Sequence, residues 1–433
     1  MFWQWEGFKM EEYIKVLLEQ IRCKKAHAAI REELCTHMEE QTADNMAAGM
    51  SREEAETAAV KDMGSPVETG ISLDRIHRPQ MAWGILGLMA VITLLANVLM
   101  HSRTFTGYSC IGFVLMVLVY RLDYTFVGRF SKIIAAAFLL LGFAYVWVEP
   151  GMNLYQMLFS AMMLYVPVYA AVVYKYHGTG YSGIIKSVLW LAAPVFLALC
   201  LPNRPLAVIL FMSMLVVLTL AIQKGWFSVE RKKATALLWA VMLGIPVPAL
   251  FVFLRFGMRE YQYERIMAWI TKSGDGAYQM QAIRRYLDGS TWVGKSAEYQ
   301  DIVNSLPDWD SGFSLTYFTA SYGKIVGIGV CALLLVLVCA AFLACTRQKN
   351  QLGMLMGVAS AMILAVNTSV NLLENAGVLP ITQTFLPFFS AGGSTILVSY
   401  ILIGIILSVY RYRNVYAAHA NVKLPSFKMT IDL

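Results

Sequence analysis

The chain has 433 residues, of which 58% are hydrophobic and only 15% are charged, and its mean hydropathy is +0.56. In soluble domains about a quarter of the residues are charged, so this composition excludes a single soluble core. The net charge of +7 favours a membrane protein over a nucleic-acid-binding protein, because cytoplasmic loops collect lysine and arginine. We therefore predict an all-α polytopic membrane protein.

Neither the cysteines nor the histidines form a ligand pattern. The seven cysteines are scattered without a CxxC pair, and the six histidines show no metal-ligand spacing. We expect no disulfide framework, no metal and no cofactor. The first residues, MFWQWEGFKMEEY, contain no apolar core or cleavage site, so we also expect no removable signal peptide.

Residues 1–79 predict a small cytoplasmic helical domain. Apolar residues recur at helical spacing from Ile14 onward. Ser51 and Glu54 form a capping-box pattern that begins a further helix, and Gly64 is placed to end it. Ser65, followed by a proline and then an acid, is typical of another helix start. The segment therefore predicts a bundle of four short helices.

Residues 80–414 predict a membrane domain of about ten transmembrane helices. A helix needs roughly 20 residues to cross the hydrocarbon. The predicted spans are 82–100, 108–120, 133–148, 154–174, 184–201, 205–222, 235–254, 313–345, 352–373 and 390–410. The second is short, and the eighth is long enough to begin with a partly buried entry segment.

The distribution of cations predicts the orientation of these spans. If the N-terminus is cytoplasmic, the outer short loops hold only Arg103 and Arg204. The inner short loops then hold Arg121, Arg129, Lys132, Lys175, Lys186, Lys224, Arg231, Lys232, Lys233, Arg347 and Lys349. Because cytoplasmic loops are enriched in lysine and arginine, we expect both termini to be cytoplasmic, with 415–433 as a tail.

The segment 255–312 forms one large outer loop in this topology. A polar insert this long between membrane helices is uncommon unless it is functional. The insert also contains several tryptophans and tyrosines, residues that anchor at headgroup depth. Two interpretations stay open: a loop lying on the membrane surface, or a site for a lipid-linked substrate.

Three segments in the C-terminal part of the chain carry motifs of a known family. Asn371–Ser394 is similar to a run of asparagine, Leu-Pro-Val-Thr-Gly, Leu-Pro-Phe and Ser-Tyr-Gly-Gly-Ser. Tyr278–Lys295 resembles a Tyr-Gln stretch with a glycine-rich segment, and Leu306–Gly323 resembles a Leu-Pro-Glu stretch. With these motifs the chain resembles the SEDS family (shape, elongation, division and sporulation proteins), which includes FtsW, RodA and SpoVE.

The N-terminal domain carries a second resemblance. Its fragments Arg31–Leu34, Gly49–Ser51, Met63–Pro66 and Leu73–Pro79 are similar to the permease prefix domain, a helical unit found ahead of membrane permeases in Gram-positive bacteria. This resemblance implies a cytoplasmic sensory or docking role, without catalysis.

The SEDS resemblance implies a peptidoglycan glycosyltransferase in the bacterial cell membrane that serves cell division, cell shape or sporulation. Its substrate would be lipid II, an undecaprenyl-diphosphate-linked precursor that is polymerised at the outer leaflet. The other implied partners are membrane lipids and a single-pass penicillin-binding transpeptidase, and no nucleic acid is expected. The chemistry needs a base for the acceptor hydroxyl and cations for the departing diphosphate.

The sequence departs from the family where this chemistry is expected. An ungapped alignment places Gly312 at the position of the family's essential aspartate, and glycine cannot take a proton. Asp310 and Asp308 are the nearest acids. The family's acidic pair is Ser321-Tyr322 here, and Pro202–Pro205 has also lost an acid. Three interpretations stay open: a divergent polymerase, a non-catalytic relative that binds lipid or a partner, and a lipid II flippase or other transporter.

Asp310 is the candidate general base, and a solvated loop acid is the alternative. Lys295 is a candidate contact for the diphosphate or lies among headgroups. Glu374 is ionisable at membrane depth, which makes it a candidate for substrate binding unless it faces the outer water. The stretch from Ser390 to Ser394 is either a flexible backbone segment beside a groove or a turn whose serine caps the last span. Its candidate substrate-binding residues are Ser390, Gly392, Gly393 and Ser394.

Overall fold

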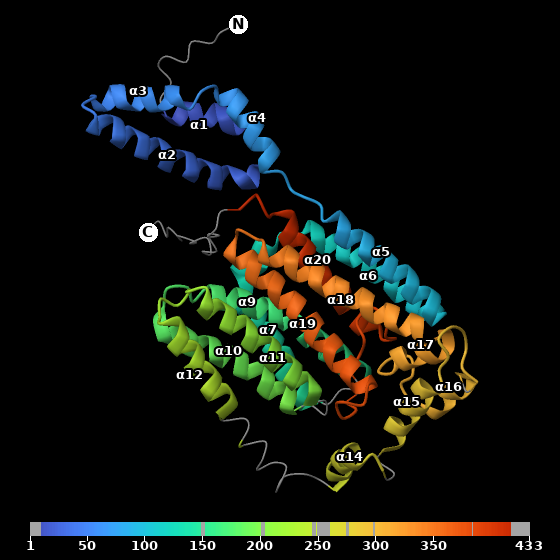
Figure 1. Ribbon diagram of the computed structural model, residues 1–433. Coiled ribbons are helices and arrows are strands. Elements are labelled where there is room, and N and C mark those ends of the chain that lie inside the picture. The colour runs from blue at the N-terminus through green and yellow to red at the C-terminus, as the bar shows by residue number, and fades with distance from the viewer. Residues whose placement is uncertain are drawn as a thin grey trace. The chain divides into compact units, whose positions relative to one another are not determined.

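The computed structural model of the chain describes residues 10–148, 152–200, 204–244, 248, 260–273, 277–297, 299–382 and 384–416. Every regular element among these residues is a helix, which confirms the all-α prediction. The described helices belong to two compact units (Figure 1). The first unit comprises Met1–Met81, Gln348–Gln351 and Tyr410–Asn421, and the second comprises Ala82–Arg347, Leu352–Val409 and Val422–Leu433.

The helices of the first unit have well-defined starts. They are α1 (Met10–Glu19), the 3-10 helix η1 (Lys24–Ala26), α2 (His27–Ala47), α3 (Arg52–Asp62) and α4 (Pro66–Ile76). The Ser51 hydroxyl accepts from the backbone N–H of Glu54, and the Glu54 carboxylate accepts from the N–H of Ser51, so the predicted capping box is confirmed. Ser65 caps α4 in the predicted way by accepting from the N–H of Glu68.

Asp74 is a buried acid that joins α4 to the residues after α1. Its carboxylate accepts hydrogen bonds from the Arg78 guanidinium, at 2.7 and 3.1 Å, and from the backbone N–H of Arg22, at 3.0 Å. The hydrogen bonds from Arg78 and Arg22 hold the pKa of Asp74 below its ordinary value. Such a carboxylate stabilises the fold above its unfolded pKa, and this contribution is lost as the pH falls through the folded pKa.

The second unit contains nine helices, among the described residues, that are long and apolar enough to cross a membrane. They are α5 (Trp83–Met100), α6 (Arg103–Arg121), α7 (Tyr124–Val148), α8 with α9 (Met152–Met162 and Tyr165–Tyr174), α10 (Gly180–Cys200), α11 (Arg204–Gln223), α18 (Lys324–Thr346), α19 (Gln351–Asn375) and α20 (Gly393–Arg411). The predicted polytopic membrane protein is confirmed. Of the predicted span 235–254, α12 (Arg231–Gly244) covers the first part, and most of the remainder lies outside the described residues.

Helices α6 and α7 begin well before their predicted starts. Helix α6 begins at Arg103, where the hydroxyl of Ser102 accepts from the N–H of Phe105, and α7 begins at Tyr124. The early parts of both helices carry cations, which end an apolar run without ending a helix. The predicted eighth span is divided at Gly323 into the entry segment α17 (Ser314–Tyr322) and α18.

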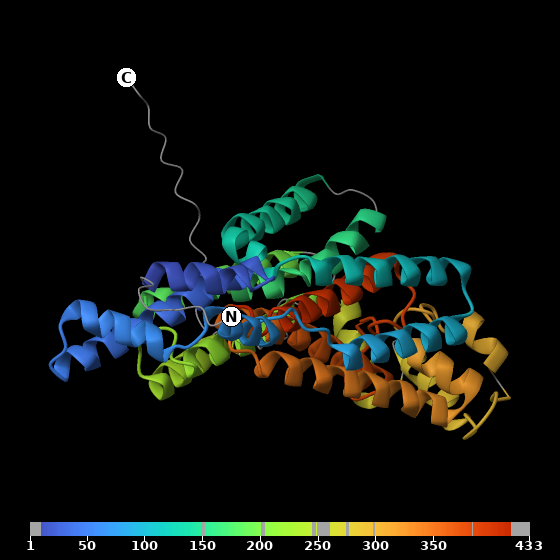
Figure 2. The same ribbon diagram turned by 90° about the horizontal axis from the view of Figure 1, so that it is seen from above.

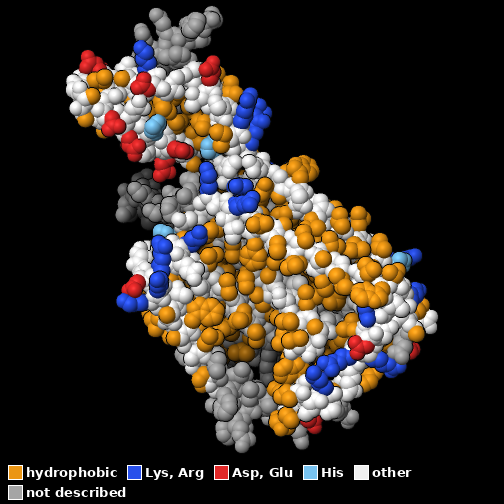
Figure 3. Space-filling view, viewed as in Figure 1, with side chains coloured by type: hydrophobic (Ala, Val, Ile, Leu, Met, Phe, Trp, Pro, Cys, Tyr) orange, Lys and Arg blue, Asp and Glu red, His pale blue; other side chains and the backbone are white. Residues whose placement is uncertain are grey.

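The helices of the second unit run alongside one another in both ribbon views (Figures 1 and 2). Helix α7 lies at the margin of this unit, and only 22% of its span is buried, the lowest value among the nine helices found in the described residues. Apolar side chains cover the visible face of the unit (Figure 3). An apolar surface of this extent is expected where a protein faces lipid.

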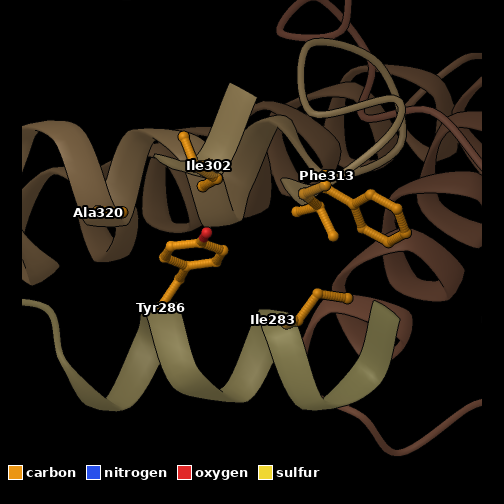
Figure 4. Packing of buried hydrophobic residues seen from close by; sticks show 6 residues of the cluster. Ile283, Tyr286, Ile302, Phe313 and Ala320 are labelled. Atoms are coloured by element: carbon orange, nitrogen blue, oxygen red, sulfur yellow. The ribbon is translucent and has the colours of Figure 1, made fainter. Parts of the chain in front are cut away.

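The segment between α12 and α17 folds into a helical layer in its described parts. It contains α14 (Glu260–Thr271), α15 (Tyr278–Asp288), η4 (Tyr299–Asp301) and α16 (Ile302–Ser305). Ile283 and Tyr286 of α15 point toward Ile302 and Phe313 and form a buried core with them (Figure 4). The layer therefore packs against α17, and we call this end of the second unit the loop end.

We expect residues 10–81 to fold when expressed alone, because the apolar faces of their helices are buried against one another. Asp74→Asn should destabilise this fragment by about 2 kcal/mol at neutral pH, since it weakens hydrogen bonds to a charged acceptor. The difference should shrink below about pH 4, where the wild-type carboxylate is itself protonated. Urea unfolding followed by circular dichroism measures both effects.

Asp62→Asn is the matched control, because Asp62 is exposed and accepts a hydrogen bond from Gln41 at the surface. It should change the stability by less than about 0.5 kcal/mol. A coil-like spectrum of the fragment, or equal effects of the two substitutions, would contradict the expectation.

Candidate functional site

Three asparagines on one face of α19 form the centre of the candidate site. Asn367, Asn371 and Asn375 are spaced four residues apart, so their side chains project from the same side of the helix. All three side chains are buried. Because a buried amide without a partner is costly, what these amides bind determines how the surrounding segments lie.

The amides of Asn371 and Asn375 hold the backbone just before α17. Their Nδ2 atoms both donate to the carbonyl oxygen of Gly312, at 2.9 and 3.2 Å. The hydroxyl of Thr316, in the first turn of α17, donates to Oδ1 of Asn375 at 2.8 Å. Segment 310–313 is therefore fixed to α19 through its backbone.

The same face of α19 holds a second irregular segment, 384–386. Asn371 also donates from Nδ2 to the carbonyl oxygen of Thr384, at 2.7 Å. Asn367 donates to the carbonyl oxygen of Phe385, also at 2.7 Å. Asn371 is thus a clamp that joins Gly312 to Thr384, two positions far apart in the sequence.

Glu374 is buried on α19 and accepts hydrogen bonds from this second segment. Its carboxylate accepts from the hydroxyls of Thr382 and Thr384, and from the backbone N–H of Thr384 at 3.3 Å. The alternative that Glu374 faces the outer water is therefore wrong. Glu374 also lines an apolar cavity of about 140 Å³ between α19 and the start of α11, at Pro205 and Ile209.

Ser390 connects the two irregular segments. Its hydroxyl donates to the carbonyl oxygen of Ser311 at 2.5 Å and accepts from the N–H of Leu386 at 2.6 Å. The N–H of Ala391 donates to the carbonyl oxygen of Asp310 at 2.6 Å. Because α20 begins only at Gly393, the alternative that this serine caps the last span is wrong.

Gly392, Gly393 and Ser394 fix the start of α20. The carbonyl of Gly392 accepts the helical hydrogen bond from the N–H of Ile396, at 3.0 Å. A Cβ on Gly393 would lie 2.6 Å from the ring of Tyr108 on α6, so only glycine allows this approach. The hydroxyl of Ser394 forms a hydrogen bond of 3.1 Å with that of Ser160 on α8.

Asp310 is the acid at the centre of this arrangement. Its side chain is half-buried, and burial raises the pKa of its carboxyl above the ordinary value, with a smaller contribution from the negative charge of Asp308. The neighbouring Trp309 packs its ring against that of Tyr317 on α17, with centroids 4.5 Å apart. A positioned carboxyl with a raised pKa is suited to accept a proton near neutral pH.

The cations lie on the loop-end layer. Lys295 is exposed, and its ammonium group lies 4.6 Å from the ring centroid of Tyr299. Ser296 beside it donates its N–H to the carbonyl of Ala320, toward the far end of α17 from Asp310. Arg284 of α15, which the sequence analysis missed, packs its guanidinium against Gly377, beyond the end of α19.

The structure thus brings together most of the predicted site residues. Asn371 bonds the segment that carries Asp310 and the segment whose Thr384 bonds Glu374, and Ser390 bonds the first of these segments at Ser311. The residues at 392–394 follow at the start of α20. Lys295 lies apart, across the length of α17, which is roughly 13 Å for nine residues at 1.5 Å each. The spacing of the asparagines inside an apolar run was the signal that could have revealed the clamp.

Comparison with known protein families identifies the family of this chain. The family described as "Cell cycle protein", with the members FtsW, RodA and SpoVE, matches residues 79–415. The chain belongs to this family. The match includes all nine membrane-spanning helices of the described residues and the loop-end layer between α12 and α17.

Curated FtsW proteins are similar to this chain in sequence. A putative peptidoglycan glycosyltransferase FtsW of Mesostigma viride is 26% identical, over 38% of this chain and 41% of that protein. A probable one of Xanthomonas oryzae is 24% identical, over 61% and 54%. The chain thus spans about half the length of these two relatives. A probable FtsW of Thioalkalivibrio sulfidiphilus is 27% identical, over 70% and 79%.

Solved structures share the fold of this FtsW/RodA/SpoVE chain. One of them is described as the structural coordination of polymerization and crosslinking by a peptidoglycan synthase complex. Its TM-score is 0.62 at 20% identity, and the match covers 77% of this chain and 98% of that one. The rod shape determining protein RodA of Thermus thermophilus has a TM-score of 0.52 at 17% identity and covers 77% and 97%.

Asn371→Ala should loosen both irregular segments, because the carbonyls of Gly312 and Thr384 each lose a buried donor. We expect a loss of about 1–3 kcal/mol for such unpaired buried groups. Faster hydrogen exchange at residues 310–313 and 384–386, together with a lower melting temperature in detergent, measures it. Leu373→Ala, at an exposed position on the same helix, is the control, and equal effects of the two substitutions would disprove the clamp.

Proposed function

We propose that this chain is a divergent peptidoglycan glycosyltransferase that polymerises lipid II at the outer leaflet of the bacterial cell membrane. Its family membership and the glycosyltransferase names of its relatives support this activity. The process served is cell division, cell shape or sporulation. A lipid II flippase and a non-catalytic lipid- or partner-binding relative are the competing functions.

The position of Asp310 carries this proposal. Gly312 has no side chain to act as a base, but the same backbone segment presents a half-buried carboxyl two residues earlier. Three hydrogen-bonded positions, Gly312, Ser311 and Asp310 itself, hold this segment through their carbonyls. A carboxyl with a raised pKa on this fixed backbone would deprotonate the acceptor sugar hydroxyl, and Arg284 and Lys295 of the loop-end layer are the candidates for stabilising the departing diphosphate.

Asp310→Ala should lower lipid II polymerisation by roughly 100-fold or more, the usual contribution of a general base. The measurement is the glycan strand length and rate formed by the purified protein, beside a lipid-translocation assay in vesicles. Because only the deprotonated carboxyl accepts a proton, wild-type activity should rise with pH through the raised pKa of Asp310. Asp308→Asn removes a neighbouring negative charge, so it should keep the activity and move this rise to lower pH.

Asp301→Ala is the control for loop acids, since Asp301 is exposed in η4, and it should leave the rate unchanged. Gly312→Asp should raise the rate, because it places an acid at the position where the family resemblance implies the essential aspartate, and Gly312 is not among the described glycines with positive φ. Robust polymerisation by Asp310→Ala would reject Asp310 as the base. Lipid translocation without polymerisation, in wild type and in Gly312→Asp, would favour the flippase.

The orientation belongs to the same proposal: both termini lie in the cytoplasm and the loop-end layer outside. The excess of cations in the opposite short loops supports it. In a cysteine-free variant, Asp288→Cys should react with a membrane-impermeant thiol reagent in intact cells, and Lys232→Cys only after lysis. Both side chains are exposed, so the reverse labelling pattern would disprove the orientation.

We assign residues 1–79 to a permease-prefix-like domain with a cytoplasmic sensory or docking role, on the strength of the resemblance of its sequence fragments. We further expect a single-pass penicillin-binding transpeptidase as partner, since a structural relative is described as part of a peptidoglycan synthase complex. Co-purification of a transpeptidase with the tagged chain, and not with a tagged unrelated membrane protein, measures this. Its absence while another family member retains its own transpeptidase would favour an orphan or transporter function.

A further inference from the structure

A group of cations lies at the end of the second unit opposite the loop end. Lys132 on α7 and Lys186 on α10 both approach the ring of Tyr176, with ammonium groups 4.5 and 6.0 Å from its centroid. Lys175, at the end of α9, donates from Nζ to the carbonyl oxygen of Arg129 on α7, at 2.6 Å. Two helices therefore direct lysines to one aromatic ring, and Lys175 precedes that tyrosine in the sequence and bonds to α7. We call Lys132, Lys175 and Lys186 the lysine cluster.

The aromatic ring at the centre of the cluster is itself fixed. Tyr176 is buried, and its hydroxyl accepts a hydrogen bond of 3.1 Å from the indole N–H of Trp190 on α10. Its carbonyl accepts from the hydroxyl of Thr179 at 2.7 Å. The ring therefore provides a defined surface under flexible lysine side chains, where cation–π attraction positions them.

The positive charge of the cluster is not neutralised by the described part of the chain. The ion pairs formed among the described residues include none of the three lysines. Burial, with a further contribution from the charge of Lys132, lowers the pKa of Lys175. Like charges held together repel one another, so an anion among them would stabilise the arrangement.

The surface beside the cluster is apolar. Ile133 and Leu140 of α7 are 61% and 69% exposed, and Ile185 and Leu189 of α10 are 62% and 64% exposed. The two pairs lie on the helices that carry Lys132 and Lys186, and α7 is the least buried of the described spans. Cations next to exposed apolar side chains at a span end match both parts of a phospholipid, its phosphate and its acyl chains.

We propose that the lysine cluster binds the phosphate group of an anionic phospholipid, whose acyl chains lie along the exposed faces of α7 and α10. A general excess of cations in the loops at this end of the second unit requires no shared aromatic centre, so it does not account for two lysines from α7 and α10 over the ring of Tyr176. The inference is independent of the proposed polymerase activity, because it concerns lipid retention at the opposite end of the unit.

The test uses the full-length protein purified in detergent and exchanged with mixtures of phosphatidylglycerol and phosphatidylcholine. Native mass spectrometry measures how much of each lipid stays bound. Lys132→Gln together with Lys186→Gln should weaken the retention of phosphatidylglycerol by roughly tenfold or more. The double substitution by arginine should keep it, because the charge remains. Phosphatidylcholine retention should be low and equal in all variants.

Lys232→Gln together with Lys233→Gln is the matched control, since it removes the same charge at the start of α12, where Lys233 pairs with Glu230 at 2.7 Å. It should leave phosphatidylglycerol retention unchanged. Equal losses in the two double glutamine variants would show an effect of net charge alone and overturn the site. Unchanged retention without Lys132 and Lys186 would overturn it as well. Displacement of the lipid by excess inorganic phosphate would show an anion site that does not need a lipid.

Discussion

Irregular backbone persists in a protein interior only where its polar groups find partners, and the centre of the second unit depends on this constraint. Segments 310–313 and 384–386 both lack a helical hydrogen-bond ladder. Asn371 satisfies a carbonyl in each of them from one amide group, and Asn367 and Asn375 extend the same contacts along α19. One helix face therefore holds two loops that are distant in sequence.

In this arrangement, the groups that hold the backbone in place differ from the groups that could react with a substrate. The amides of α19 and the hydroxyl of Ser390 contact backbone carbonyls, so they fix the path of the chain without using its side chains. Asp310, which could act on a substrate, lies on one of the segments that are held, while the candidate cations Arg284 and Lys295 lie on the loop-end layer.

The sequence predicted most of the fold because hydropathy and capping are local properties. Nine spans follow from continuous apolar runs, and the capping box follows from the spacing of Ser51 and Glu54. The starts of α6 and α7 were placed too late because cations there were taken as the end of the span. The clamp of Asn371 escaped prediction because its partners, Gly312 and Thr384, are defined only by the tertiary fold, and the same reason explains the misplaced role of Ser390.

The contacts at Gly312 have an evolutionary consequence. Helix α19 contacts this residue through its carbonyl oxygen, a group that every residue type has. These hydrogen bonds therefore do not require an acid at position 312, and selection for them would preserve the path of the backbone without preserving the chemistry.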